Sequence, residues 1–596
     1  MKRRSSPGVA FGDYISTGSP SIRRGGYEKQ YTMREFILPA ILIVVLSVLF
    51  FRLVAIQLVH GSYYRALSDK NRIKTETIHA SRGVIFDRYG TPLVFNVPGF
   101  RESVDGKTTQ ISQKKAVELL SHGATGLEID SLRQYPYREE FGHVIGYVSQ
   151  ISKDELRSPE FSAYRGGDVI GKMGIEQEYE KKLIGTDGKK LQEVNSMGNP
   201  VRTLGQSDPI PGVDITLTLD AKLQHAAFEA TKGIKQGVVI VSKLNGEVLV
   251  MLSRPSFDPN LFTLDETYEV ASNAAYTELS QVLLDGDRQP LLDRAISGTY
   301  PPGSTFKLVT AAAGLENHII DKNYEIQDTG IIYLGAFSFS NWFFTQHGRT
   351  DGVVDVIKAI QRSNDIFFYK LAELVGVETL SKVAQKFGVG SRLGIDLPGE
   401  KAGVLPTNEW KQKNVGEPWY LGDTYHYGIG QGYLLTTPLQ VNAWTQAIAN
   451  QGKLYRPRLL KDDKSVVLSD TLLDSKNMEL IRQGMIGACI PGGVAWPFFD
   501  YKVKNPKLKI DGKNITEVPQ ATTSADFSEY RHVTVACKTG TAQHGGEQTL
   551  PHAWITLFAP AYNPEIVVTV LVESAGEGSS VAAPIAKKVL DEYFSR

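Results

Sequence analysis

A long apolar run near the N-terminus constrains this chain more than any other feature. Residues 36–51 read FILPAILIVVLSVLFF without a charge, and after Arg52 the apolar run continues to Val59. About 20 apolar residues suffice for a helix to cross a bilayer, and an arginine near its end can extend to the interface. The alternatives are a helix buried in a soluble core and a cleaved signal peptide, which would need a shorter apolar core. We predict an uncleaved transmembrane helix over residues 36–59.

The charges that flank this run predict its orientation. Basic residues outnumber acidic ones in the first 35 residues. The basic residues are Lys2, Arg3, Arg4, Arg23, Arg24, Lys29 and Arg34, and the acidic ones are Asp13, Glu28 and Glu35. Positively charged segments next to a transmembrane helix usually stay in the cytoplasm. We therefore expect residues 1–35 to form a cytoplasmic tail. The chain would be a single-pass protein of the cytoplasmic (inner) membrane, with everything from residue 60 onward outside the cytoplasm.

Composition excludes several function classes. The 596 residues carry 65 Lys+Arg against 65 Asp+Glu, so the net charge is zero and a broad nucleic-acid-binding surface is not expected. No Cys/His cluster has the spacing of a metal site, and we predict neither a metal nor a cofactor. At roughly 100–200 residues per domain, the length allows several units.

The chain divides into two extracytoplasmic parts by its patterning. Residues 60–205 are charged and turn-rich, with a helical pattern that places Ile175, Tyr179 and Leu183 on one face. From residue 206 onward strands alternate with longer helices, beginning with a strand over 213–219 and a hairpin over 237–252 that turns at Asn245-Gly246. Strands near 533–541 and 553–572 precede a final helix over 584–594, and 491–530 reads as a surface insertion. We predict an α+β fold, with helices packed on an antiparallel sheet.

One segment carries a nucleophile pattern. Pro301-Pro302-Gly303 precedes an apolar pattern that predicts a helix opening at Ser304, with Lys307 three residues later. Residues at i and i+3 share a helix face, where a desolvated lysine can take the serine proton. The same S-x-x-K spacing occurs at Ser112 and Lys115, which we interpret as a solvated helix face.

Three further motifs follow in order. They are RSNDIFFYKLA at 362–372, GDTYHYGIGQG at 422–432 and VACKTGTAQHG at 535–545. S-x-x-K, a second serine motif and K-T-G together are the signature of penicillin-binding proteins and class A β-lactamases. With RGVIFDRYG at 82–90, GIDLPGE at 394–400 and AAPIAKKVLDEYF at 582–594, the chain resembles a class B penicillin-binding protein. It resembles the elongation type of these membrane-anchored peptidoglycan transpeptidases most.

The resemblance implies a role for each motif residue. Ser304 would be the acylated nucleophile, Lys307 its base and Ser363 a proton shuttle toward the departing amine. Asp365 stands where the second motif usually has asparagine, and either a catalytic or a structural hydrogen-bonding role fits it. The K-T-G segment would bind the terminal carboxylate of the substrate, and backbone N–H groups would form the oxyanion hole. The residues that bind the carboxylate would be Lys538, Thr539, Gly540 and Thr541. The N–H groups of the oxyanion hole would be those of Ser304 and Thr541.

The resemblance also implies a fold and partners. Residues 206–596 would form a penicillin-binding, β-lactamase-like transpeptidase domain, and residues 60–205 a dimerisation-type pedestal. The substrates would be peptidoglycan stem peptides, and β-lactam antibiotics would acylate the same serine. A SEDS-family glycan polymerase and other cell-wall elongation proteins would dock on the pedestal and the anchor.

Several alternatives stay open on the sequence alone. A β-lactamase or carboxypeptidase would need a group that activates water, and no separate E-x-x-L-N segment is present. A non-catalytic antibiotic sensor would usually carry several spans and a cytoplasmic effector. A division-type transpeptidase also stays open, although the acidic third position of the second motif, Asp365, resembles the elongation branch more than the division branch. Cys489 and Cys537 either form a disulfide in this oxidising compartment or are two buried thiols.

Overall fold

The computed structural model describes residues 33–104, 107–124, 127–195, 200–265, 267–470, 473–504, 510–511, 514–515, 530–546 and 549–596. Most of the expected cytoplasmic tail, residues 1–32, lies outside this range, as does much of the expected insertion over 491–530. Among the described residues, one compact unit comprises 33–76 with 190–195 and 200–205, and the other the described parts of 77–189 and 206–596.

The first unit contains the apolar helix. It begins as α1 (Met33–Val54), passes through a π-helical turn at Ala55–Val59, and is followed by α2 (Gly61–Arg72). Residues Phe36–Val59 have a mean hydropathy of 2.8 and are not buried against the rest of the protein. By length and composition this is a helix that can cross a membrane, as predicted. Strands β1 (Ile73–Ile78), β8 (Gly188–Val194) and β9 (Pro200–Ser207) form a three-stranded sheet in the order β1-β8-β9.

The second unit begins with a small sheet centred on β3 (Pro92–Val104), which pairs antiparallel with β2 (Ile85–Phe86), β4 (Lys107–Ser112) and β5 (Glu128–Gln134). The strand predicted over 213–219 is shorter, because only β10 (Ile215–Thr216) pairs, parallel to β2. Short elements complete this region: α3 (Gln113–Ser121), α4 (Gly142–Ile145), β6 (Val148–Gln150), β7 (Val169–Gly171), α5 (Gly174–Glu178) and α6 (Glu180–Leu183).

The helix predicted to place Ile175, Tyr179 and Leu183 on one face is interrupted. Tyr179 has φ −104° and ψ 22°, so the segment is two short helices, α5 and α6. Buried acidic side chains lie on the inner side of this segment, where Arg82 donates to Glu176 Oε2 and to Glu180 Oε2, each at 2.6 Å. The segment is therefore shaped by a buried ion-pair cluster as well as by an apolar face.

A five-stranded sheet forms the centre of the second unit, in the order β12-β11-β25-β24-β23. Every neighbouring pair is antiparallel, as predicted. The hairpin of β11 (Gly237–Ser242) and β12 (Val248–Arg254) turns at Asn245-Gly246, where Gly246 has φ +86°. The other strands are β23 (Ala536–Ala542), β24 (His552–Ala559) and β25 (Ile566–Val572), and β23 is an edge strand.

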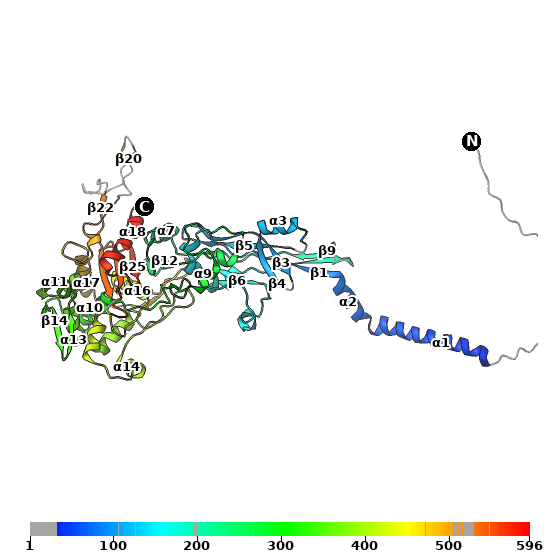
Figure 1. Ribbon diagram of the computed structural model, residues 1–596, viewed down its shortest axis with the longest axis horizontal. Helices are drawn as coiled ribbons and strands as arrows, with labels where there is room; N and C mark the ends of the chain where they lie inside the picture. Colours follow the sequence, from blue (N-terminus) through cyan, green and yellow to red (C-terminus); the bar gives the residue numbers. More distant parts are fainter. Residues whose placement is uncertain are drawn as a thin grey trace, which may run out of the picture. The chain divides into compact units, whose positions relative to one another are not determined.

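Helices cover both faces of this sheet. On one face lie α7 (Ala221–Ala230), α18 (Ala583–Phe594) and the end of α17 (Ser475–Ala488), and Figure 1 shows α18 beside α7. On the other face lie α10 (Lys307–Glu316) and α16 (Pro438–Ala449). Both faces are apolar because the inner strands read almost continuously hydrophobic, as in the β25 sequence IVVTVLV.

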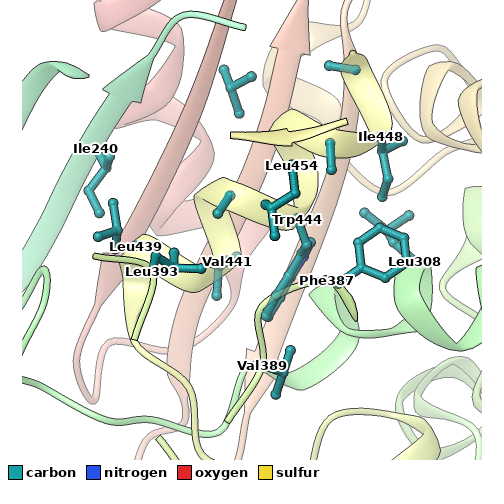
Figure 2. Close-up of a cluster of buried hydrophobic side chains, with 14 of the residues drawn as sticks. Ile240, Leu308, Phe387, Val389, Leu393, Leu439, Val441, Trp444, Ile448 and Leu454 are labelled. Carbon is teal, nitrogen blue, oxygen red and sulfur yellow. The ribbon is translucent and has the colours of Figure 1, made fainter. Parts of the chain in front are cut away.

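Trp444 of α16 anchors the core behind the helix that follows Ser304. Figure 2 shows it beside Phe387 and Leu308, which comes from α10. Its indole also meets the ring of Phe306 edge to face at 6.1 Å between centroids. The α16 helix begins with a capping box, in which Thr437 and Gln440 satisfy each other's backbone N–H groups. The fixed position of α16 thus supports α10 from behind.

The remaining helices and strands surround these layers. The helices are α8 (Asn260–Thr263), α9 (Leu279–Leu284), α11 (Trp342–His347), α12 (Val356–Arg362), α13 (Asp365–Lys386), α14 (Asn408–Asn414) and α15 (Leu421–Gly428). Small hairpins and paired strands are β13 (Ile326–Gln327) with β16 (Val353–Val354), β14 (Ile331–Leu334) with β15 (Phe337–Ser340), and β17 (Leu454–Tyr455) with β18 (Val467–Ser469). Within 491–530, β19 (Lys502–Lys504) pairs with β22 (Tyr530–His532), and Ile510–Asp511 pairs with Asn514–Ile515.

Candidate active site

Ser304 lies in a tight turn just before a helix, not at the start of the helix as predicted. Residues Gly303–Thr305 form a 3₁₀ turn, and α10 begins at Lys307. Gly303 has φ +54°, and its N–H donates to Gly430 O at 2.9 Å. This left-handed glycine bends the chain after Pro302 and delays the helix. The Ser304 side chain is partly exposed, and its hydroxyl has no hydrogen-bond partner among the described residues.

The GIGQG segment at 428–432 packs directly against this turn. Gly430 has φ +78°, and a Cβ on it would collide with Gly303 O and lie 2.8 Å from Phe306 Cβ. The backbone of the nucleophile turn can approach so closely only because this residue has no side chain. The segment is therefore a structural turn beside Ser304.

Substitution Gly430→Ala tests the importance of this close approach. Gly416→Ala is the matched control, because Gly416 also has positive φ (+83°) but open space around its Cβ position. The control should lose about 1–2 kcal/mol of unfolding free energy from its backbone conformation. Gly430→Ala should lose about 1–3 kcal/mol more from overlap and should also acylate more slowly with penicillin. Equal stability and equal labelling of the two variants would contradict this view of the turn.

Lys307 is completely buried and faces the second motif. Its Nζ donates to Asp365 Oδ1 at 2.6 Å, to Ser363 O at 2.8 Å and to Ser363 Oγ at 3.3 Å. Burial lowers the pKa of Lys307, and the neighbouring Asp365 carboxylate opposes that decrease. Three of the predicted site residues are thus brought together around one amine.

The second motif is a helix junction with a left-handed residue at its centre. Ser363 ends α12 with φ +54° and ψ +39°, which is uncommon for a residue with a side chain. Asn364 then caps α13, because its Oδ1 accepts the Phe367 N–H at 2.9 Å. Asp365, the first residue of α13, turns toward Lys307. The structure therefore supports reading the motif as Ser363-Asn364-Asp365, with the acid at the third position facing the lysine.

The K-T-G motif lies on β23, at the edge of the sheet. Lys538 is completely buried, and its Nζ donates to Thr539 O at 3.0 Å. Burial lowers its pKa well below the usual value, and the nearby Lys307 lowers it further. Thr539 points to the opposite face of the strand, and Thr541 is exposed. The strand therefore borders the site, and β23 is the edge strand of its sheet.

Gly540 brings this strand against the nucleophile turn. A Cβ at Gly540 would lie 3.2 Å from Pro302 O and 3.1 Å from Thr305 Cγ2. The missing side chain therefore makes room for the protein's own turn at residues 302–305.

Two other sequence features are placed by the structure. Cys489 and Cys537 form a disulfide that joins the end of α17 to β23, one residue before Lys538, with Cα atoms 6.1 Å apart. The second S-x-x-K pattern is a helix cap and not a helix face, because Ser112 precedes α3 and its hydroxyl accepts the Lys115 N–H at 3.1 Å.

The structure adds residues that no motif indicated. Trp342 N–H donates to Asp365 Oδ2 at 3.0 Å, and Asp365 N–H donates to Asn341 Oδ1 at 3.2 Å. Both residues lie more than 20 positions before Asp365. No pattern local to that segment signals the contact, because it arises from tertiary packing.

Two models of known protein families match this chain. A family model for the penicillin-binding protein transpeptidase domain matches residues 236–591, and one for the penicillin-binding protein dimerisation domain matches residues 107–217. The peptidoglycan D,D-transpeptidase MrdA of Haemophilus influenzae is 34% identical, over 92% of this chain and 90% of its own length.

Two solved structures are also similar. One is the complex between penicillin-binding protein PBP2 and MreC from Helicobacter pylori, with a TM-score of 0.70 and 29% identity over 87% of this chain and 98% of that chain. The other describes the structural coordination of polymerization and crosslinking by a peptidoglycan synthase complex, with a TM-score of 0.69 and 27% identity over 94% and 98% of the two chains. The chain therefore belongs to the penicillin-binding protein transpeptidases, within the class B elongation type that its motifs predicted.

Proposed function

We propose that this protein crosslinks peptidoglycan stem peptides during cell elongation, through an acyl-enzyme on Ser304. The observation that carries the proposal is the convergence of three motifs on one buried amine. Lys307 contacts Ser363 and Asp365, and its positive charge lowers the pKa of Lys538. The named D,D-transpeptidase relative supports the reaction class. A β-lactam would acylate the same serine.

Acylation begins when the Ser304 hydroxyl attacks the carbonyl carbon between the two D-alanines of a stem peptide. Lys307 accepts the hydroxyl proton in its neutral form, which its buried position favours. The backbone N–H groups of Ser304 and Thr541 stabilise the oxyanion. As the C–N bond breaks, the proton returns through Lys307 and Ser363 to the departing amine, and terminal D-alanine leaves.

The second half-reaction reverses these roles. An amine from a neighbouring stem peptide attacks the acyl carbon and gives its proton to Lys307. Lys307 passes this proton to the Ser304 oxygen as the C–O bond breaks, which restores the serine hydroxyl and the neutral lysine. The K-T-G segment would hold the terminal carboxylate of the donor peptide before it is cleaved. Thr539 and Thr541 offer hydroxyls on one face of β23, and Lys538 lies on the other face, where the charge of Lys307 lowers its pKa. The outer edge of β23 suits an extended peptide, because an edge strand can pair its backbone with an added strand.

The alternative functions are not favoured. The MrdA relatives of Haemophilus influenzae and Escherichia coli carry transpeptidase names, and the family models match both a dimerisation and a transpeptidase segment. That pair of segments fits neither a β-lactamase nor a sensor. The MrdA relatives favour the elongation role over the division role.

The N-terminal part would hold the catalytic domain outside the membrane. Residues 1–35 would be cytoplasmic and 36–59 would span the membrane, followed by a pedestal at 60–205 and the transpeptidase domain at 206–596. The H. pylori complex with MreC and the synthase complex support cell-wall partners for proteins of this fold. A SEDS-family polymerase docked on the pedestal and the anchor would couple glycan synthesis to crosslinking. Pedestal truncations that left polymerase activation intact would refute this coupling.

An exchange assay tests the reaction class. The full-length protein in detergent would be incubated with a D-Ala-D-Ala stem peptide and a labelled D-amino acid as acceptor. A transpeptidase releases D-alanine and joins the acceptor to the peptide. Release without joining would indicate a hydrolase, and neither product from a protein that labels with penicillin would indicate a sensor.

A further inference from the structure

We propose that Asn341 and Asp328 are positioning residues for the reaction, which act on Lys307 by holding Asp365 in place. This inference deepens the proposed function and rests on it. Both residues lie outside the four motifs, in the segment between α10 and α12. Both are buried, with exposed fractions of 0% for Asn341 and 2% for Asp328.

Asp365 is held on three sides. One carboxylate oxygen, Oδ1, accepts from Lys307 Nζ at 2.6 Å, and the other, Oδ2, accepts from Trp342 N–H at 3.0 Å. The backbone N–H of Asp365 donates to Asn341 Oδ1 at 3.2 Å. The turn at 341–342 therefore fixes both the backbone and the carboxylate of Asp365, and so decides which oxygen faces the lysine.

Asp328 fixes that turn in its own position. Its Oδ2 accepts from Asn341 Nδ2 at 3.0 Å, from Asn364 Nδ2 at 2.9 Å and from Asp351 N–H at 2.9 Å. Its Oδ1 accepts from Gly330 N–H at 2.8 Å. One buried carboxylate thus joins the residue before α11 to the residue before α13. We call Asp328, Asn341 and Asn364 the Asp328 clamp.

The clamp encloses the strained part of the second motif. Ser363 has φ +54°, a conformation that persists only where neighbouring contacts enforce it. Asn364, the next residue, is held by Asp328 and by Asp351 Oδ2 at 3.0 Å. Because Ser363 presents both its carbonyl and its hydroxyl to Lys307, a shift of the clamp would move two more partners of the amine.

The clamp should therefore influence the protonation of Lys307. The charged groups that face this amine are Asp365 from α13 and Lys538 from β23. Displacing Asp365 weakens the interaction that raises the pKa of Lys307 and leaves burial, which lowers it. The neutral base would then persist to lower pH, while its alignment with Ser304 would be worse.

The test compares Asn341→Ala with Asn260→Ala in the full-length protein. Asn260 is an asparagine of similar burial that makes the same two kinds of bond. Its Oδ1 accepts Tyr135 N–H at 2.9 Å, and its Nδ2 donates to Asp258 Oδ1 at 2.8 Å. Its Nδ2 also donates to Tyr135 O at 2.8 Å and to Tyr268 Oη at 3.3 Å. It lies outside the site, so it reports the effect of lost stability alone. The readouts are the thermal midpoint and the rate of acylation by a fluorescent penicillin as a function of pH.

Asn341→Ala should be acylated about 10- to 100-fold more slowly, because a small misplacement of the reacting groups costs that much in rate. The acidic limb of its pH–rate profile should move to lower pH. Asn260→Ala should keep both the rate and the limb of the wild type. Asp328→Asn, which keeps the shape and most of the bonds, should lie between the wild type and Asp328→Ala. If one clamp variant fails to fold, the others still decide the outcome.

Two results would count against different claims. A folded Asn341→Ala or Asp328→Ala protein with the rate and limb of Asn260→Ala would overturn the role of the clamp. A wild-type protein that is never labelled at Ser304 would instead overturn the proposed function.

Discussion

Replacing Lys307 with methionine should slow acylation of Ser304 by a penicillin about 10²- to 10⁴-fold, the usual contribution of a general base. Methionine fills the buried site without an amine, so the packing around α10 should be retained. The prediction follows from the position of Nζ, which is buried and contacts the second motif at two residues. The second-order rate constant for labelling by a fluorescent penicillin measures it.

The second S-x-x-K pattern provides the control for this experiment. Lys115→Met changes a lysine at the same spacing from a serine, but there the hydroxyl caps a helix. Its labelling rate should equal that of the wild type. A Lys307→Met protein that is folded and labels within about tenfold of the wild type would mean that another group activates the serine.

Replacing Asp365 with asparagine should lower the maximal acylation rate about 10- to 100-fold and move the acidic limb of the pH profile to lower pH. The direction of the shift follows from the charges. The Asp365 carboxylate stabilises the Lys307 ammonium and raises its pKa, against the lowering by burial. Without that carboxylate the pKa of Lys307 falls further, so the neutral base is populated at more acidic pH.

The two effects of Asp365→Asn separate a catalytic role from a purely structural one. A variant that merely loosened the fold would lower the amplitude of labelling and leave the limb in place. A limb that moved to higher pH would contradict the ion pair between Asp365 and Lys307. The profile is measured with the same penicillin label, and circular dichroism at each pH checks that the protein stays folded.

Short-range patterns predicted the parts of this molecule that depend on neighbouring residues. The apolar run at 36–59, the Asn245-Gly246 hairpin and the final helix were predictable, because alternation, turn residues and helical periodicity act over a few positions. The order of the motifs predicted which side chains would meet. Lys307 and Asp365 are 58 positions apart and hydrogen-bonded in the structure.

Features that depend on tertiary contacts were not predictable. Arg82 pairs in the interior with Glu176 and Glu180, more than 90 positions away and on either side of the break at Tyr179, and periodicity alone shows neither the pairing nor the break. The 3₁₀ turn at Ser304 depends on the contact between Gly303 and Gly430, more than 120 residues apart. The Asp328 clamp joins three segments through buried polar groups, and such networks leave no periodic signal.

Mapping the penicillin adduct tests the central claim most directly. The full-length protein and its Ser304→Ala variant would be incubated with penicillin, digested, and analysed by peptide mass spectrometry. We predict one stable adduct in the wild type, on the peptide that contains Ser304, and none in Ser304→Ala. An adduct on any other residue, or an adduct that persists in the folded Ser304→Ala protein, would contradict the assignment of Ser304 as the nucleophile.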